Sequence, residues 1–213
     1  MPIEVNNELL KLMKLFDFKL IECSFKGEVT RSMFKVVSKI SQKDVQKLFL
    51  KLGFNDVHED LVNICSNLSL LAIGTDKCGD NKALKLYFKN IQERFINIAG
   101  DKSLLLFEIA KQNKLEVMCA LNLYKDKQSG LTKKIYLDIP EQECNLQIIE
   151  LKDLNKKLLN ALPDLMNQLN FNLEKVNKIN NTIAVMHEND VPLTCIGVDI
   201  DSSEIKLYFD HGQ

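Results

Sequence analysis

The fold is decided by three short phrases of one form: Lys85-Leu86-Tyr87-Phe88, Lys134-Ile135-Tyr136-Leu137 and Lys206-Leu207-Tyr208-Phe209. Each phrase alternates apolar residues with a lysine and a tyrosine, which is the pattern of a strand with one buried face. The chain has only four tyrosines, so three of them in one phrase indicate a repeat rather than chance. We therefore expect three equivalent strands.

A second apolar segment stands before each phrase, at the distance of a hairpin. These segments are Ile73-Gly74-Thr75-Asp76, Leu121-Asn122-Leu123-Tyr124 and Ile196-Gly197-Val198-Asp199. The residues between the two segments are rich in Gly, Asp, Asn and Ser, which favour turns. A less regular hairpin surrounds Lys26-Gly27-Glu28. The sequence thus predicts four hairpins, near residues 19–40, 68–89, 115–139 and 193–210.

Between the hairpins the apolar pattern changes to helical periodicity. The expected helices cover residues 44–52, 57–65, 91–98, 103–112, 151–160 and 165–176, the last two separated by a break around Pro163. A lone strand is expected at residues 182–187. The spacings between equivalent lysines, taken from Lys35 onward, are 50, 49 and 72 residues. A ββαα unit repeated about four times accounts for these spacings.

The repeat predicts an α+β fold, with residues 1–213 as a single domain. Helix pairs would cover the Leu/Phe face of an antiparallel sheet, and the Lys/Tyr face would not be covered by helices. In an open sheet that second face contacts water, whereas in a closed barrel it lines the lumen.

The composition excludes several classes of protein. Lys and Arg total 28 against 29 Asp and Glu, so the chain lacks the cation surplus of a general nucleic-acid binder. Charges interrupt the first twenty residues, which predicts neither a secretory signal nor a membrane span. The six cysteines are widely spaced without a C-x-x-C pair, which is typical of a reducing compartment such as the cytoplasm. The common nucleotide, serine-hydrolase and zinc-protease motifs do not occur.

The pattern resembles the aromatic prenyltransferases of the ABBA type, whose ββαα units curl into a barrel with the helices outside. The resemblance implies that lysines of the repeated phrases hold a prenyl diphosphate and that their tyrosines shield the carbocation. These residues are Lys85, Lys134 and Lys206 for the diphosphate, and Tyr87, Tyr136 and Tyr208 for the carbocation.

The first hairpin is similar to that of the cyanobactin and indole prenyltransferases. Glu22-Cys23-Ser24 resembles their E-x-S strand, which makes Glu22 the expected acceptor-binding general base. Arg31 stands where those members carry a cationic diphosphate ligand, and Lys35 lies on the same face. Physically, a diphosphate leaving group needs several converging cations, and an allylic cation needs an electron-rich, water-free surface.

Two departures from the family stand out. The family generally has five units, so a four-unit barrel could remain open or need a second copy of the chain to close it. The first hairpin, at Met33-Phe34-Lys35-Val36, lacks the tyrosine. Some members bind magnesium with the diphosphate and others do not, which leaves the metal undecided. Asp76 and Asp199 recur at equivalent positions, and turn capping is the simpler interpretation of them.

Three hypotheses follow. The first is a prenyltransferase acting on an aromatic small molecule or a peptide side chain. The second is a non-catalytic barrel that binds a hydrophobic or phosphorylated ligand. The third is an α+β interaction module whose three tyrosines are all freely exposed on an open sheet.

Overall fold

The computed structural model describes residues 18–26, 29–37, 40–51, 54, 62, 69–78, 81–89, 92–124, 131–138 and 148–209. These residues form five helices and eight strands in an α+β fold, and every strand pair with a defined register is antiparallel. The chain divides into two compact units, residues 1–91 with 120–132 and residues 92–119 with 133–213. Each unit is described by itself.

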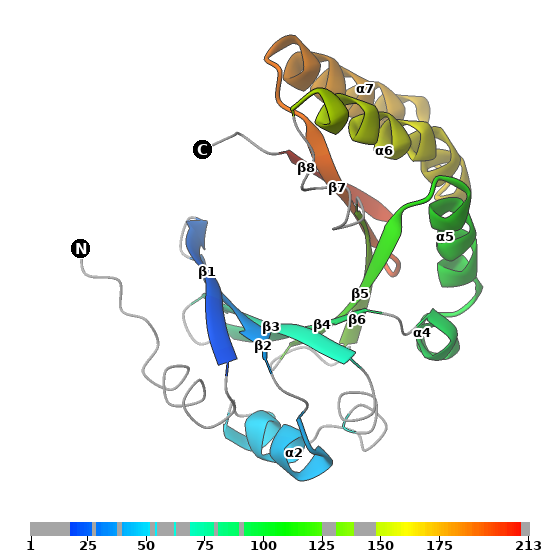
Figure 1. Ribbon diagram of the computed structural model, residues 1–213. Helices are drawn as coiled ribbons and strands as arrows, with labels where there is room; N and C mark the ends of the chain where they lie inside the picture. Colours follow the sequence, from blue (N-terminus) through cyan, green and yellow to red (C-terminus); the bar gives the residue numbers. More distant parts are fainter. Residues whose placement is uncertain are drawn as a thin grey trace. The chain divides into compact units, whose positions relative to one another are not determined.

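Unit 1 contains the first two hairpins (Figure 1). Its elements are β1 (Phe18–Lys26), β2 (Val29–Val36), α2 (Gln42–Lys51), β3 (Ser69–Cys78) and β4 (Asn81–Lys89), followed by the end of β5 (Glu116–Tyr124). The strands lie in the sheet in the order in which they occur in the chain. The register places Arg31 opposite Asp76 and Gly74 opposite Lys85.

One face of this sheet supplies the apolar core of unit 1. The large side chains on it are no more than 1% exposed: Phe34, Ile73, Leu84, Leu86 and Phe88. Helix α2 contributes Val45, Leu48 and Phe49, and its first turn is capped by Ser41, whose Oγ accepts a bond from the Asp44 N–H. Burying each such side chain contributes about 1.5–3 kcal/mol. Because side chains alternate along a strand, the lysines and tyrosines must lie on the other face.

Unit 2 contains the last hairpin and four of the helices. Its elements are α4 (Gln92–Ala99), α5 (Asp101–Gln112), the start of β5, most of β6 (Leu131–Asp138), α6 (Ile148–Gln168), α7 (Leu173–Glu188), β7 (Leu193–Asp199) and β8 (Glu204–Phe209). Strands β6, β7 and β8 are consecutive in the sheet. The helices line one side of these strands, where Ile135, Leu137, Ile196 and Val198 are fully buried (Figure 1).

The four hairpins occupy the positions expected from the sequence, and so do α2, α4 and α5. Gly100, with a φ of 76°, separates α4 from α5, where its lack of a side chain permits the left-handed turn. The helix expected at 57–65 lies outside the described residues apart from Val62. The barrel would involve both units together, and its closure stays a prediction.

The predictions for residues 151–187 are wrong in three respects. The helix expected at 165–176 is interrupted at residues 169–172, which separate α6 from α7. Helix α6 continues through Pro163, because the apolar stripe of Leu158, Leu162 and Leu165 runs past the proline and is buried. The expected strand at 182–187 is instead the second half of α7. Its β-branched residues favour a strand locally, but the helical spacing of Val176, Ile179 and Ile183 continues to the end. None of the described helices is both long and apolar enough to cross a membrane.

The N-cap of α7 offers a direct test of this helix. The Asn172 side chain accepts a 2.9 Å bond from the Lys175 N–H. Asn172→Ala should lower the free energy of unfolding by about 0.5–2 kcal/mol, measured by urea denaturation, because that N–H loses its partner. Asn180→Ala, in the exposed middle of the same helix, is the matched control and should be neutral or slightly stabilising. Equal losses in both variants would contradict the helix.

Candidate functional site

The candidate site is the sheet face that carries lysine and tyrosine, here called the Lys/Tyr face. In unit 1 it holds Arg31 from β2, Gly74 and Asp76 from β3, and Lys85 and Tyr87 from β4. In unit 2 it holds Lys134 and Tyr136 from β6, Gly197 and Asp199 from β7, and Lys206 and Tyr208 from β8. The same residue types therefore recur in equivalent places in the two units.

Two cations converge on one carboxylate in unit 1. Arg31 binds Asp76 with two bonds, from Nε to Oδ1 at 3.0 Å and from Nη2 to Oδ2 at 3.2 Å. Lys85 Nζ lies 2.5 Å from Asp76 Oδ2. The three residues come from three neighbouring strands, so the register of the sheet sets their geometry. We call this group the Arg31–Asp76–Lys85 cluster.

The charge state of the cluster follows from its contacts. Burial raises the pKa of the Asp76 carboxyl, but the bonds from Arg31 and Lys85 outweigh burial, so this pKa lies below its ordinary value of 3.8. Asp76 is therefore ionised at neutral pH. The cluster itself consists of two cationic side chains and one carboxylate. The side chains of Lys85 and Asp76 are only 14% and 19% exposed, so screening by solvent is limited.

Tyr87 lies over the backbone beside this cluster. A Cβ added to Gly74 would stand 3.4 Å from Tyr87 Cε2, which shows that the ring rests against the glycine. Tyr87 is 9% exposed. An aromatic ring over a strand glycine replaces the packing that the glycine itself lacks.

Unit 2 repeats the arrangement with one cation fewer. Lys134 Nζ lies 3.0 Å from Asp199 Oδ2, and the Ser202 N–H donates to the other oxygen of the same carboxylate at 3.1 Å. Burial raises the pKa of Asp199, but the bonds from Lys134 and Ser202 bring it below the usual range. This ion pair contains one cation and one carboxylate.

Gly197 is covered by two tyrosines. A Cβ at this position would stand 3.1 Å from Tyr136 Cε1 and 3.1 Å from Tyr208 Cε2. The two rings have centroids 6.0 Å apart and are tilted by 53°. Tyr208 is 39% exposed, whereas Tyr87 is nearly buried. The three tyrosines are therefore not all freely exposed, which was the condition set by the interaction-module hypothesis.

The structure brings together only some of the residues predicted from the sequence. Arg31 and Lys85 meet at one carboxylate, and Lys134 shares its face with Tyr136 and Tyr208. Lys206 is exposed and stands opposite Gly197. Lys35 is exposed and stands between Lys19 and Ala72 in the register, away from the cluster. The Glu22 backbone pairs with Met33, and its side chain lies outside the described residues.

The sequence interpretation missed the partners of the lysines. Turn capping was expected for Asp76 and Asp199. Both form ion pairs with a lysine of the Lys/Tyr face, and Asp199 also accepts a bond from a turn N–H. Both aspartates belong to a Gly-x-Asp sequence, one in β3 and one in β7. In unit 2 the register sets Gly197 opposite Tyr136 and Asp199 opposite Lys134. In unit 1 it sets Gly74 opposite Lys85 and Asp76 opposite Ala83, so the contact between Asp76 and Lys85 is diagonal.

Among the described residues of this face, the two carboxylates do not fit a protein-held magnesium site. The carboxylates of Asp76 and Asp199 already accept bonds from cationic groups, and no three His, Cys, Asp or Glu side chains gather anywhere in the described part of the chain. Magnesium prefers carboxylate oxygens that are not shared with cations. We derive no step through a metal.

No protein-family model matches the chain, and neither a curated protein nor a solved structure gives a significant match. The ABBA resemblance therefore depends on the residues and the repeat alone.

The two glycines predict different responses to the same substitution. Gly197→Ala places a Cβ at 3.1 Å from two rings and should destabilise the protein by about 1–3 kcal/mol through overpacking. Gly74→Ala meets only contacts of 3.4 Å and longer, so it should change the free energy of unfolding by less than about 1 kcal/mol. Urea denaturation of both variants measures the difference. Equal effects would contradict the close packing of Tyr136 and Tyr208 over Gly197.

The lowered pKa of Asp76 makes the stabilisation from the cluster depend on pH. It is fully present above the ordinary pKa of 3.8 and is lost as the pH falls through the lower pKa of the folded protein. Asp76→Asn should therefore cost on the order of 1–3 kcal/mol at pH 7, and this cost should shrink below about pH 4. Unfolding free energies of both proteins between pH 7 and pH 3 provide the measurement. A difference that stays constant over this range would refute the ionised pair.

Proposed function

We propose that the Lys/Tyr face binds a prenyl diphosphate and transfers its prenyl group to an aromatic small molecule or a peptide side chain. One observation carries the proposal: cations from two strands, Arg31 and Lys85, converge on one carboxylate beside a nearly buried tyrosine. A diphosphate can use the same donors as the Asp76 carboxylate, since both present oxygen acceptors to charged N–H groups.

The chemistry assigns a role to each group. Cleavage of the C–O bond leaves the electron pair on the diphosphate, whose charge Arg31 and Lys85 stabilise. The allylic cation that remains faces Tyr87, and attraction to an aromatic face contributes about 0.5–2 kcal/mol. An aromatic carbon or heteroatom then forms the new bond to the prenyl carbon, and its proton passes to a base.

Glu22 is the proposed base. The register places Glu22 opposite Met33 and Ser24 opposite Arg31, so Glu22 belongs to the same sheet face as Arg31. Lys134, Lys206 and the tyrosines of unit 2 are proposed to supply further contacts to the donor. Closure of the strands into a barrel, in one chain or with a second copy, belongs to the same proposal because the carbocation must be kept from water.

A thermal-shift titration tests donor binding. Dimethylallyl, geranyl and farnesyl diphosphate should each be added to the full chain, and at least one should raise the melting temperature. Lys85→Ala should weaken binding about tenfold or more, since it removes a charge-assisted bond. Lys206→Ala should also reduce the shift. The matched control is Lys111→Ala, which removes an exposed lysine and should leave the shift unchanged. No shift with any prenyl diphosphate would remove the basis of the proposal.

The second candidate is a binding protein that captures a phosphorylated or hydrophobic ligand without chemistry. It is favoured by the ion pairs of Lys85 with Asp76 and of Lys134 with Asp199, because a paired lysine is less available to a leaving group. Mass spectrometry after incubation with a donor and aromatic acceptors separates the two candidates. Binding without a prenylated product would favour the second.

A further inference from the structure

The third Lys-x-Tyr phrase differs from the other two on its apolar side. Leu86 and Phe88 of β4 are 0% exposed, as are Ile135 and Leu137 of β6. The equivalent residues of β8, Leu207 and Phe209, are only half-buried. Strand β8 therefore lacks the tight apolar cover that β4 and β6 have.

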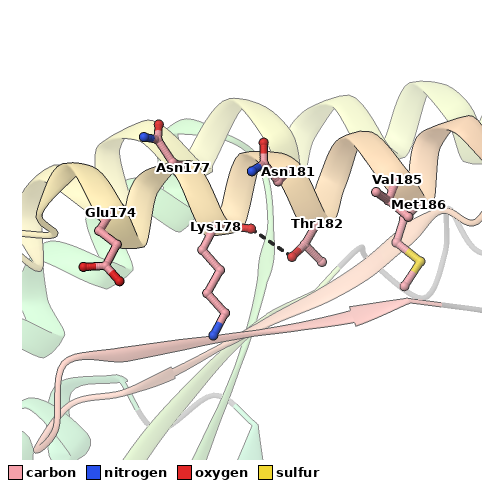
Figure 2. A pocket seen from close by; sticks show the side chains of 7 residues that line it. All are labelled: Glu174, Asn177, Lys178, Asn181, Thr182, Val185 and Met186. Atoms are coloured by element: carbon pink, nitrogen blue, oxygen red, sulfur yellow. Dashed lines mark hydrogen bonds between the residues drawn. The ribbon is translucent and has the colours of Figure 1, made fainter.

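A groove between β8 and α7 accounts for this exposure. It has a volume of about 360 Å³ and is lined on the strand side by Glu204, Ile205, Leu207 and Phe209, and on the helix side by Phe171, Lys175, Lys178, Ile179 and Thr182. A second hollow of about 550 Å³ runs along α7 and shares Lys178 and Thr182 with the first (Figure 2). The groove falls in the size range of small-ligand sites and has their mainly apolar lining.

The helix above the groove is not built like a core helix. Helix α6 buries Leu158, Leu162 and Leu165, whereas α7 has no buried residue over sixteen positions. Two lysines and a threonine stand beside Ile179 on its groove side, and Figure 2 shows the Lys178 side chain extending down from the helix toward the strands. A helix that only had to cover Leu207 and Phe209 would not need cationic side chains there.

Two positive charges stand at this apolar groove. Lys178 has no ion pair among the described residues, and the Lys175 Nζ lies 5.2 Å from the centroid of the Phe171 ring. Glu204 lines the groove from the strand side without pairing with either lysine in the described structure. A cation beside apolar surface is best satisfied by an anion that brings its own apolar body.

We propose that this groove binds a free long-chain carboxylate, with the chain against Ile179, Leu207 and Phe209 and the carboxylate on Lys178 and Lys175. The site is separate from the Lys/Tyr face, because Leu207 and Phe209 point to the side of β8 opposite Lys206 and Tyr208. A partner helix is the weaker occupant, since α7 already takes the helix position above β8 and leaves only a narrow space beneath it.

Fluorescent titration with cis-parinaric acid tests the proposal on the full chain, which has no tryptophan to interfere. Binding should saturate and should be displaced by palmitate but not by hexadecanol at the same concentration. Lys178→Glu should weaken binding about tenfold or more, because it replaces the attracting charge by a repelling one. Lys111→Glu, at an exposed lysine of α5 outside the groove, is the matched control and should bind as the wild type does.

Thr182→Phe fills the groove without changing its charge and should abolish binding. Asn180→Phe adds the same ring at an α7 position that lines neither hollow, and it should bind normally. Circular dichroism melts check that each variant folds, and if Thr182→Phe does not fold, Lys178→Glu alone decides. The proposal is overturned by absence of saturable binding, by unchanged affinity in Lys178→Glu, by equal displacement with hexadecanol, or by binding only to anionic phospholipid vesicles. Loss of parinarate binding in Lys85→Ala would also overturn it, because that residue belongs to the other site.

Discussion

The ion pair between a lysine and an aspartate on neighbouring strands is the interaction on which the Lys/Tyr face depends. Lys85 with Asp76 and Lys134 with Asp199 place opposite charges next to each other where solvent reaches neither fully. A partly buried lysine without such a partner would lose much of its hydration, and no ion pair would compensate for that cost in free energy. The pairs therefore let a sheet bury Leu and Phe on one side while keeping cations within a partly enclosed second side.

The two strand glycines leave room for the tyrosine rings of the Lys/Tyr face. Gly74 and Gly197 stand two residues before the paired aspartates, and the tyrosine rings lie directly over them. A larger residue at Gly197 would push Tyr136 and Tyr208 away from the strand, so charge pairing and ring packing are linked through one strand segment. Unit 1 adds Arg31 to this plan, so that cationic side chains from two strands converge in its cluster, which makes it the better candidate for an anionic substrate.

On the helix side of the sheet, α6 and α7 differ in the side chains that they place against the strands. Helix α6 presents a continuous leucine stripe, while α7 presents two lysines and a threonine beside Ile179 above Leu207 and Phe209. Local composition does not explain this difference, since both helices mix apolar and charged residues at helical spacing. The position of α7 over a strand that remains half-exposed distinguishes the groove from an ordinary solvated helix face. Two faces of one hairpin thus carry two separate candidate sites.

The hairpins, the helices α2, α4 and α5, and the face on which Lys85, Lys134 and the tyrosines lie could be predicted from the sequence, because period-two alternation and turn residues are local properties. The sequence also contains the repeated Gly-x-Asp, but the partners of its aspartates depend on strand register. The pairing of Asp76 and Asp199 with lysines, the passage of α6 through Pro163 and the helical state of residues 182–187 are seen in the tertiary structure alone. Ion pairs depend on the register between strands distant in the chain, and helix limits depend on which apolar stripe finds a core to bury it. Neither can be derived from residues that are neighbours in sequence alone.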